Sequence, residues 1–526
     1  MKRNLNEVAD ASFDIAVVGG GITGAGVARH ATLAGLKTVV LEASDFAAGT
    51  SSRSTKLIHG GLRYLAMGDV ALVRETALER KRLFEMAPHL TEPQWMVVPA
   101  RSRLELAKFR IGISLYERLG AVGRADRHIN WTQQDLIAEE PLLNRQAFPF
   151  ACRYREYLTD DARLVMATLR GAALQGAQVC NRLAVTGLEQ DADGVRLTCR
   201  DTIGNAPVSL RAKVVVNATG PWVEQLAAGS GGGSDTPRLH LSKGVHIGVP
   251  RDRLPVRNMV MLTADDRRPV FAIARGNVTY IGTTDTTEEG EPTLWPAVKR
   301  ADVEYLLKPI QRYFPEAKLD QSDVVSTWAG LRPLINQPGK APKEMSRKEE
   351  VWRTGRLVTI AGGKLTGFRK MAEQVMVEVA QILDKPVDVE QPLLTLPGGE
   401  QSDLGGLMHQ IAARYPVDAQ ASRRLMRLYG SEVFDVLGEK PTPITKAVFA
   451  EEIVWAVTQE CALSLEDVVY RRLRVPWFRP EETETVAVAA ADLLAAHFSW
   501  SAQHRDCELG ALRSRVSSDL SFRLDA

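Results

Sequence analysis

The chain has 526 residues, too many for a single hydrophobic core, so we expect two or three domains. Hydrophobic residues make up 45% and charged residues 25%, the composition of an ordinary globular protein. The formal net charge of +2 provides no general attraction to nucleic acid, and we expect no nucleic-acid partner.

Cysteine usage and hydropathy further narrow the class of protein and its expected cellular location. The five cysteines form no C-x-x-C pair, which predicts reduced thiols in a cytoplasmic setting and no metal site. A polar leader without a signal-peptide core precedes the first apolar run, and no run of about 18 uncharged apolar residues follows. We therefore expect a cytoplasmic protein that does not span a membrane.

The first predicted unit is a strand, a glycine-rich turn and a helix. Ile15–Val18 is typical of a buried parallel strand, and Gly19, Gly21 and Gly24 after it fit the pattern G-x-G-x-x-G. The helix is predicted to begin near Ile22 and to direct its N-terminal amides at a pyrophosphate.

A second strand completes this unit. Thr38–Leu41 is predicted to be the strand, and Glu42 follows it where a carboxylate can accept hydrogen bonds from a ribose diol. The order of strand, turn, helix, strand and acid predicts a dinucleotide site, and these residues alone leave NAD and FAD open.

Two segments after this unit carry distinctive patterns. Thr50–Leu65, "TSSRSTKLIHGGLRYL", begins with small hydroxyl residues suited either to lining a cofactor or to a capped surface turn. Arg101–Arg124 is predicted to form an amphipathic helix whose broad apolar face and basic residues suit either a membrane interface or burial against the protein body. The predicted face comprises Leu104, Ala107, Ile111, Leu115 and Leu119, with Phe109, Ile113 and Tyr116 at its edge.

Later segments predict a second sheet, a return to the first and a helical tail. Val214–Val216 is a further buried strand, and strand patterns between residues 241 and 285 indicate an antiparallel sheet. Residues 355–383 repeat the strand, glycine and helix plan around Gly363 and Lys364, so we expect this unit to rejoin the first sheet. From about Leu404 to Phe498 the pattern is helical.

Several long motifs in order closely resemble the FAD-dependent, aerobic glycerol-3-phosphate dehydrogenases. Besides the first glycine motif and Thr50–Leu65, they are "DDARLV", "NATGPWV", "KGVHI", "IGTTD", "GLRPL" and "AGGKLT". The resemblance implies an α/β flavoprotein with a Rossmann-like FAD domain of the glutathione-reductase/amino-acid-oxidase type, an antiparallel β substrate domain and an α-helical C-terminal domain. The predicted division is 1–95, 155–235 and 350–388 for FAD, 96–154 and 236–349 for the substrate, and 389–526 for the helices.

The resemblance also implies the activity and its partners. It implies oxidation of sn-glycerol 3-phosphate to dihydroxyacetone phosphate, with FAD as cofactor and a membrane quinone as electron acceptor. We accordingly expect peripheral association with the inner face of the cytoplasmic membrane, and a homodimer is one further expectation. An oxygen-reducing oxidase of the same fold, acting on glycerol 3-phosphate or on an amino acid or amine, stays open, as do an NAD-dependent dehydrogenase and a non-catalytic binding protein.

The resemblance assigns residues to the cofactor and to the chemistry. Arg63 and Arg332 are the predicted phosphate clamps, because guanidinium pairs with two phosphate oxygens at once. The general base is predicted to be His246, with His59 as second choice. The other predicted catalytic and substrate residues are Lys364, Tyr64, Thr284 and Arg347. The predicted FAD-binding residues are Gly19, Gly21, Ile22, Thr23, Gly24, Glu42, Ala43, Thr50, Ser51, Ser52, Ser54, Lys56, Leu57, His59, Thr219, Gly220, Gly363, Lys364, Leu365 and Thr366.

The chain departs from the family pattern at two places. Gly367 and Phe368 stand where many relatives carry threonine and tyrosine, and Asn336–Ser346 lacks the usual acidic character. Because of these two departures, the sequence specifies the substrate less exactly than it specifies the flavin cofactor.

Overall fold

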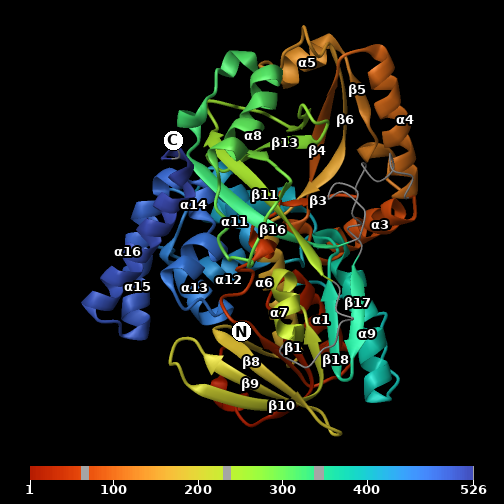
Figure 1. The fold of residues 1–526 in the computed structure, drawn as a ribbon. Coiled ribbons are helices and arrows are strands. Elements are labelled where there is room, and N and C mark those ends of the chain that lie inside the picture. Colours follow the sequence, from red (N-terminus) through yellow and green to blue (C-terminus); the bar gives the residue numbers. More distant parts are fainter. Residues whose placement is uncertain (61–69, 229–237, 337–348, 525–526) are drawn as a thin grey trace.

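The computed structural model describes residues 1–60, 70–228, 238–336 and 349–524, which form two β-sheets and a set of helices (Figure 1). One sheet lies in the lower half of this view, the other lies in the upper half, and the C-terminal helices, in blue, lie beside both. Among the described residues, no helix combines the length and the apolar character that a membrane crossing requires.

The first sheet carries the N-terminal glycine motif. Its strands run in the order β17-β18-β10-β1-β2-β7, with β9 paired to β10 and β8 paired to β9. From β18 to β7 the neighbours are parallel, as predicted for a dinucleotide-binding unit. The bounds are β1 Ser12–Val18, β2 Thr38–Leu41, β7 Gln178–Cys180, β8 Leu183–Gln190, β9 Val195–Asp201, β10 Pro207–Asn217, β17 Glu350–Thr354 and β18 Leu357–Ala361.

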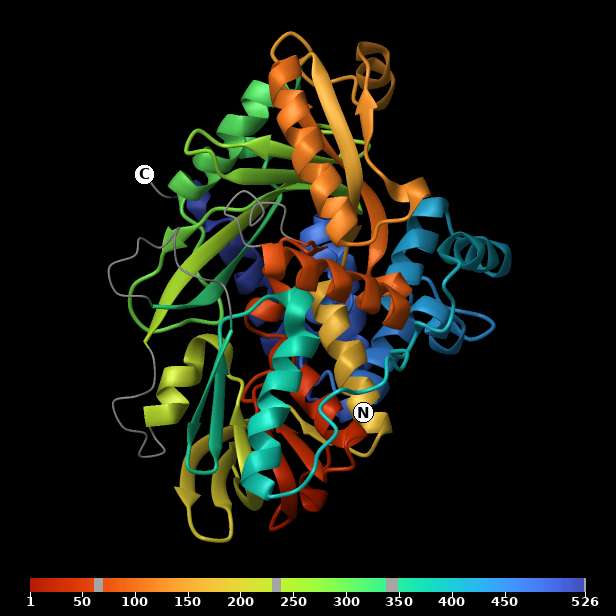
Figure 2. The same cartoon turned by 90° about the vertical axis from the view of Figure 1, so that its right-hand side faces the viewer.

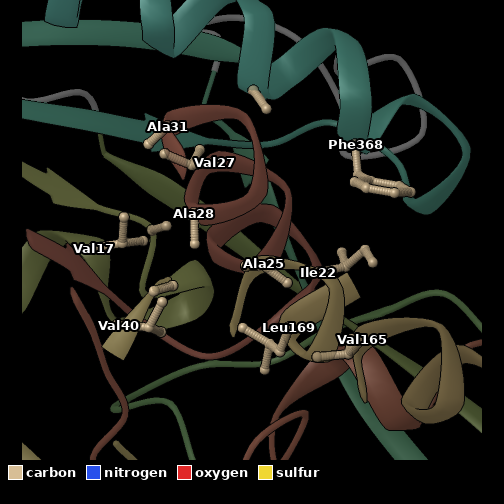
Figure 3. Close-up of a cluster of buried hydrophobic side chains, with 14 of the residues drawn as sticks. Val17, Ile22, Ala25, Val27, Ala28, Ala31, Val40, Val165, Leu169 and Phe368 are labelled. Atoms are coloured by element: carbon tan, nitrogen blue, oxygen red, sulfur yellow. The ribbon is translucent and has the colours of Figure 1, made fainter. Parts of the chain in front are cut away.

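The helix after the glycine turn, α1 (Ile22–Leu33), packs against α6 (Asp161–Leu174) and α9 (Phe368–Leu383) (Figure 3). A Cβ on Gly26 would lie 2.7 Å from the Phe368 ring, so this glycine lets α1 approach α9 closely. Since β18 pairs with β10 and α9 packs on α1, the prediction that the late strand–glycine–helix unit rejoins the first sheet is confirmed.

The second sheet is mainly antiparallel, as predicted. Its order is β15-β11-β14-β13-β12-β4-β6-β3, with β16 paired to β11 and β5 paired to β6. The bounds are β3 Leu57–Ile58, β4 Glu92–Ala100, β5 Ile129–Trp131, β6 Phe150–Leu158, β11 Leu239–Pro250, β12 Met259–Thr263, β13 Pro269–Arg275, β14 Val278–Gly282, β15 Thr286–Thr287 and β16 Ser326–Ile335. Two strands cross the predicted domain boundaries, since β4 runs through residue 95 and β6 through residue 154, and β3 pairs with β6 across the same division.

The C-terminal helices share a core with the second sheet. Trp328 and Tyr280 of that sheet contact Trp477 and Phe478, with ring centroids 5.4–6.0 Å apart. The helical tail is therefore packed into the molecule. Its helices are α10 Leu404–Arg414, α11 Ala419–Tyr429, α12 Val433–Leu437, α13 Ala450–Glu460, α14 Val475–Phe478, α15 Thr483–Phe498 and α16 Ala502–Asp519.

The predicted amphipathic helix is α4 (Arg103–Leu119), which lies at the edge of the second sheet (Figure 2). Leu104 is 68% and Ile111 is 72% exposed, whereas Ile113 and Tyr116 are buried in the core that the sheet and the tail share. Interpreting the last two as an extension of the exposed face was wrong, because they lie on the side that packs inward. The remaining helices are α3 Val70–Met86, α5 Gln133–Glu139, α7 Val223–Ala228 and α8 Arg300–Tyr313.

Candidate active site

A cavity of about 830 Å³ lies between the two sheets. It runs from the first glycine turn, past the turn that carries Lys364, to Arg332 on β16. The predicted site residues that line it are Gly19, Gly21, Ile22, Thr23, Glu42, Ala43, Thr50, Ser51, Ser54, Leu57, His59, Thr219, Gly220, His246, Thr284, Arg332, Gly363, Lys364, Leu365 and Thr366. The fold thus brings most of the predicted set into one space.

The first glycine turn is built for close backbone contact. Gly19 has a φ of +111°, which side chains with a Cβ rarely adopt. A Cβ on Gly24 would lie 1.9 Å from the Gly19 carbonyl oxygen, so Gly24 does not line the cavity but lets α1 begin against the turn. The turn therefore leaves its own backbone open to a ligand.

Glu42 and Ser51 hold this turn from the cavity side. The Glu42 carboxylate accepts hydrogen bonds from the amides of Gly20 and Ser44, both at 2.7 Å. Burial raises the pKa of the Glu42 carboxyl. The Ser51 hydroxyl accepts a hydrogen bond from the Ile22 amide at 3.0 Å, and its own hydrogen can be donated to a phosphate oxygen.

Two other turns face the first one across the cavity. Gly220 begins a short 3-10 helix after β10, beside Thr219, whose hydroxyl donates to Asn217 at 2.7 Å. Gly363 has a φ of +76°, and a Cβ there would lie 2.4 Å from the Met371 sulfur. The glycine before Lys364 thus permits both the backbone conformation and the packing on α9.

The far end of the cavity is cationic. Arg332 donates to the Thr283 hydroxyl at 2.9 Å and to the Thr284 carbonyl at 3.2 Å, and its ion pair with Asp285 measures 3.3 Å. Arg268 also lines the cavity and lies 3.6 Å from the same Asp285 carboxylate. Arg268 also lies 3.3 Å from the Asp266 carboxylate, so two guanidinium groups and two carboxylates meet at this end of the cavity.

His246 on β11 lies beside this end. Its Nε2 is 2.9 Å from the Thr55 hydroxyl, its ring stacks on Trp328 at 5.0 Å, and its Nδ1 has no hydrogen-bond partner among the described residues. Burial, and then the charges of Lys56 and Arg332, lower the pKa of His246 well below its usual value. The imidazole is therefore neutral at physiological pH, and the same burial and charges disfavour its protonated form.

The structure places two predicted cofactor residues away from the cavity. The Lys56 ammonium is buried and donates to the Asp161 carboxylate at 3.1 Å and to the Ser52 carbonyl at 2.9 Å. The Ser52 hydroxyl, also buried, reaches the Gly49 carbonyl at 3.4 Å. Both side chains were expected to line the cofactor site. They instead hold in place the loop whose other residues line it.

Other predictions fall outside the described residues or away from the site. Arg63, Tyr64 and Arg347 lie outside the described residues. Gly367 and Phe368, where the chain departs from its relatives, do not line the cavity, and the Phe368 ring is buried against α1. The Thr284 hydroxyl is tied to the β11 backbone, since it accepts from the Val245 amide at 2.9 Å.

Sequence reasoning missed two arginines that line the cavity. Arg53 stands inside the quoted Thr50–Leu65 motif, and its guanidinium stacks on Trp295 at 4.0 Å. Arg268 precedes Pro269 at the start of β13, and only the pairing of β13 with β14 signals that this end faces Asp285. Basic residues flanking a predicted strand are usually solvated, so the sequence offered no distinct signal for Arg268.

The cavity residues fit FAD. The close-packed glycine turn, a buried carboxylate that retains acceptor capacity, and a second turn bearing a lysine are what a dinucleotide with an electron-accepting ring requires.

Comparison with known proteins agrees with this geometry. The FAD dependent oxidoreductase family model matches residues 14–368, and the model described as the C-terminal domain of alpha-glycerophosphate oxidase matches residues 393–505. The aerobic glycerol-3-phosphate dehydrogenase of Staphylococcus epidermidis is 35% identical, covering 96% of this chain and 94% of that protein. The protein of that name from Staphylococcus aureus is 35% identical over 95% of this chain and 93% of its own length.

A solved structure is similar over almost the whole chain. The glycerol-3-phosphate dehydrogenase from Bacillus halodurans, complexed with FAD, has a TM-score of 0.79 and 31% sequence identity, covering 98% of this chain and 97% of that one. The predicted fold class and the predicted cofactor are confirmed. The chain belongs to the FAD-dependent oxidoreductases and, within them, to the aerobic glycerol-3-phosphate dehydrogenase family.

Proposed function

We propose that the protein oxidises sn-glycerol 3-phosphate to dihydroxyacetone phosphate. The observation that carries the proposal is the convergence of Arg332 and Arg268 at one end of the cavity that also contains His246 and Lys364. Two guanidinium groups suit a phosphate dianion. The dehydrogenase relatives in the two staphylococci support the same substrate.

In this proposal the protein binds the substrate and manages one proton. Arg332 and Arg268 hold the phosphate, with Arg63, Tyr64, Thr284 and Arg347 as further predicted substrate contacts. His246 accepts the C2 hydroxyl proton while C2 loses a hydride and its C–O bond becomes a carbonyl. FAD, when bound, supplies the acceptor for that hydride at N5. Lys364 stabilises the negative charge that this transfer creates nearby.

His246 is the first candidate for the base because its imidazole lines the cavity near Arg332 and is neutral before the reaction. Its lowered pKa keeps the ring unprotonated across the physiological range, and Thr55 fixes its orientation. His59 lines the same cavity and stays the second candidate. A loss of turnover in His246→Gln with retained substrate affinity supports the assignment, and the same loss confined to His59→Gln moves the role to His59.

The experiment is anaerobic mixing of the flavin-loaded enzyme with sn-glycerol 3-phosphate while the flavin absorbance is followed. We expect rapid bleaching by this substrate and none by glycerol, because glycerol lacks the phosphate that the arginines bind. Bleaching by glycine or sarcosine instead would assign the enzyme to the amine-oxidising branch of the fold. Peroxide release in air would mark an oxidase.

We further propose that electrons pass to a membrane quinone at a surface formed by α4. The exposed side chains Leu104, Ile111 and Leu115 recur on one side of this helix, and Lys108 and Arg118 are exposed around them. Exposed apolar side chains flanked by cations suit an interface with anionic lipid. Peripheral association with the inner membrane and a homodimer remain part of this proposal.

Charged substitutions on the exposed face of α4 test the membrane part. We expect Leu104→Glu with Ile111→Glu to abolish sedimentation with anionic vesicles while turnover with a soluble dye is kept. The matched control is Leu174→Glu, because Leu174 is 74% exposed but ends α6, away from α4. Vesicle binding that survives the double substitution would refute this surface.

A further inference from the structure

A second, smaller cavity lies outside the active site, between the second sheet and the C-terminal helices. Its volume is about 110 Å³, and it is walled by the end of β13, by α11 and by the segment from Leu473 to Arg479. Eight arginines and no aspartate or glutamate line it within the described chain. We call it the arginine pocket.

The deep arginines of the arginine pocket are buried and partnered. Arg275 donates to Asp160 at 2.6 Å, Arg474 lies 3.4 Å from the same carboxylate, and Arg479 donates to Glu482 at 2.7 Å. These pairs hold the sheet, α6 and the tail together. They form a fixed floor whose charges are largely compensated.

The rim of the pocket differs, because its arginines form no ion pair within the part of the chain that the structure describes. Arg251 and Arg423 are exposed, and neither has a side-chain hydrogen bond or an ion pair among the described residues. Arg257 is exposed as well and donates only to the Ala138 carbonyl, at 2.6 Å. Within the described residues, Arg251 and Arg423 are therefore two positive charges without an ion pair, while the charge of Arg257 acts on the nearby Glu140 carboxyl.

The wall formed by α11 adds a donor without a partner. Arg424 pairs through Nη1 with Glu452 at 2.8 Å, while its buried Nη2 has no hydrogen-bond partner in the described parts of the chain. Arg427 is paired with Glu92. Burial, and then the positive charges of Arg423 and Arg427, lower the pKa of Arg251. Mutual repulsion of this kind is expected where several guanidinium groups lie close together.

We propose that the arginine pocket binds a small phosphate-type dianion from solution. The proposal rests on the rim arginines Arg251 and Arg423, which form no ion pair within the described residues, on the buried Nη2 of Arg424 and on the shape of the pocket. Guanidinium groups converging from several directions match the oxygens of a tetrahedral oxyanion, and the excess charge attracts it. A pocket of this size holds the phosphate group itself, and the rest of a phosphorylated metabolite would extend past the rim.

Binding there would link two parts of the molecule. Arg251 and Arg257 come from the loop between β11 and β12, whereas Arg423 and Arg424 come from α11. A dianion that contacts both sides would tighten the contact between the substrate-side sheet and the helical tail. We therefore expect occupancy to stabilise the holoenzyme against unfolding.

The test is titration of the flavin-loaded enzyme with inorganic phosphate at constant ionic strength. It follows both the heat of binding and the unfolding temperature. The pocket variant is Arg251→Ala with Arg423→Ala, chosen because neither side chain has a hydrogen bond or an ion pair to a described residue. The matched control is Arg196→Ala with Arg200→Ala, which removes two exposed charges from β9. The Arg332→Ala variant removes the proposed phosphate contact in the active site, so it distinguishes phosphate binding there from phosphate binding in the arginine pocket.

We expect saturable phosphate binding in the wild type, in Arg332→Ala and in the β9 control, with a rise in unfolding temperature. In the pocket variant we expect affinity to fall at least tenfold, with flavin content and the Michaelis constant for glycerol 3-phosphate unchanged. Equal phosphate affinity in wild type and pocket variant would overturn the proposal. A second result would also overturn it. If free phosphate bound neither the wild type nor the pocket variant, and only the pocket variant lost binding to anionic vesicles, the ligand would be a lipid head group.

Discussion

Arg332 illustrates how one residue at the end of the cavity combines structure and chemistry. Its guanidinium is held by two threonines and by Asp285, so its position is fixed before substrate arrives. Arg268 lies near the same carboxylate and also pairs with Asp266, so both guanidinium groups are held at this end of the cavity. Preorganised donors of this kind favour a bound oxyanion over water.

Substituting Arg332 tests the phosphate contact. We expect Arg332→Ala to weaken transition-state binding of glycerol 3-phosphate by about 2–4 kcal/mol, because a charge-assisted contact is lost. Arg332→Lys should recover part of this energy, because it keeps the charge but not the fork. Steady-state kinetics give both values, and an unchanged kcat/KM in the alanine variant would exclude the role.

Gly24 is a second residue whose replacement has a defined effect. Since a Cβ there would meet the Gly19 carbonyl at 1.9 Å, Gly24→Ala must displace either the glycine turn or α1. We expect the purified variant to lose most of its flavin, measured from its absorbance spectrum. Gly510→Ala is the control, because that helical glycine has open space around it and should retain full flavin content.

At the scale of residues, the sequence predicted what depends on local backbone chemistry. Gly19, Gly24 and Glu42 act through a turn and the strand next to it, and the spacing of these residues specifies both. Lys56 was misjudged because its partner, Asp161, is more than a hundred positions away and pulls the ammonium beneath the loop. Arg268 was missed for the same reason, since Asp285 becomes its neighbour only when β13 and β14 pair.

Among the elements, α1 contains a buried histidine that makes the stability of the fold depend on pH. Burial lowers the pKa of His30 on α1 to about 4, and the His30 Nδ1 lies 3.1 Å from the Gly26 carbonyl. Above pH 6.5 the ring is neutral in both folded and unfolded chains. As pH falls toward 4, the unfolded chain binds a proton that the folded chain does not, so stability decreases.

His30→Gln tests this coupling, because the amide can still donate to Gly26 and does not titrate. We expect the free energy of unfolding to fall less steeply between pH 6.5 and 4 than in the wild type, by at most about 1.4 kcal/mol per pH unit. Denaturant titrations at several pH values measure the slopes. The slope should not vanish, since burial also lowers the pKa of His89, to about 3. Identical slopes would contradict the assignment.

Element prediction succeeded where one periodicity dominated and failed where two faces competed. The turn, α1 and β2 follow from short regular patterns, and their predicted starts match the structure. For α4, the apolar residues extend around most of the helix. A sequence pattern cannot indicate which side faces the core, and the contacts of Ile113 and Tyr116 with the second sheet settle that question.

For the whole molecule, buried ion pairs join the helical tail to the flavin-binding sheet. Asp45, directly after the first βαβ unit, accepts hydrogen bonds from Arg471 at 2.6 Å and from Arg472 at 2.7 Å. Arg163 of α6 makes two 2.6 Å bonds to Glu460 of α13. The tail was predicted as a separate helical domain of unknown role, and these contacts give it a structural one.

Removing one charge from this network tests its importance. Asp45→Asn keeps the shape but leaves two buried guanidinium groups without their shared carboxylate, so we expect a loss of about 3–5 kcal/mol in stability. The control is Asp191→Asn, whose pair with Arg211 lies at the surface and should contribute little to stability. Urea unfolding followed by flavin fluorescence compares the two, and equal midpoints would contradict the account.

The central claim is that one cavity between two sheets holds the flavin beside the Lys364 turn and the substrate phosphate at its arginine end. A crystal structure of the enzyme with FAD and dihydroxyacetone phosphate tests it most directly. We predict pyrophosphate at the Gly19–Gly24 turn and the product phosphate within hydrogen-bonding distance of Arg332 and Arg268. A product phosphate bound away from both arginines, or a flavin outside this cavity, would contradict the claim.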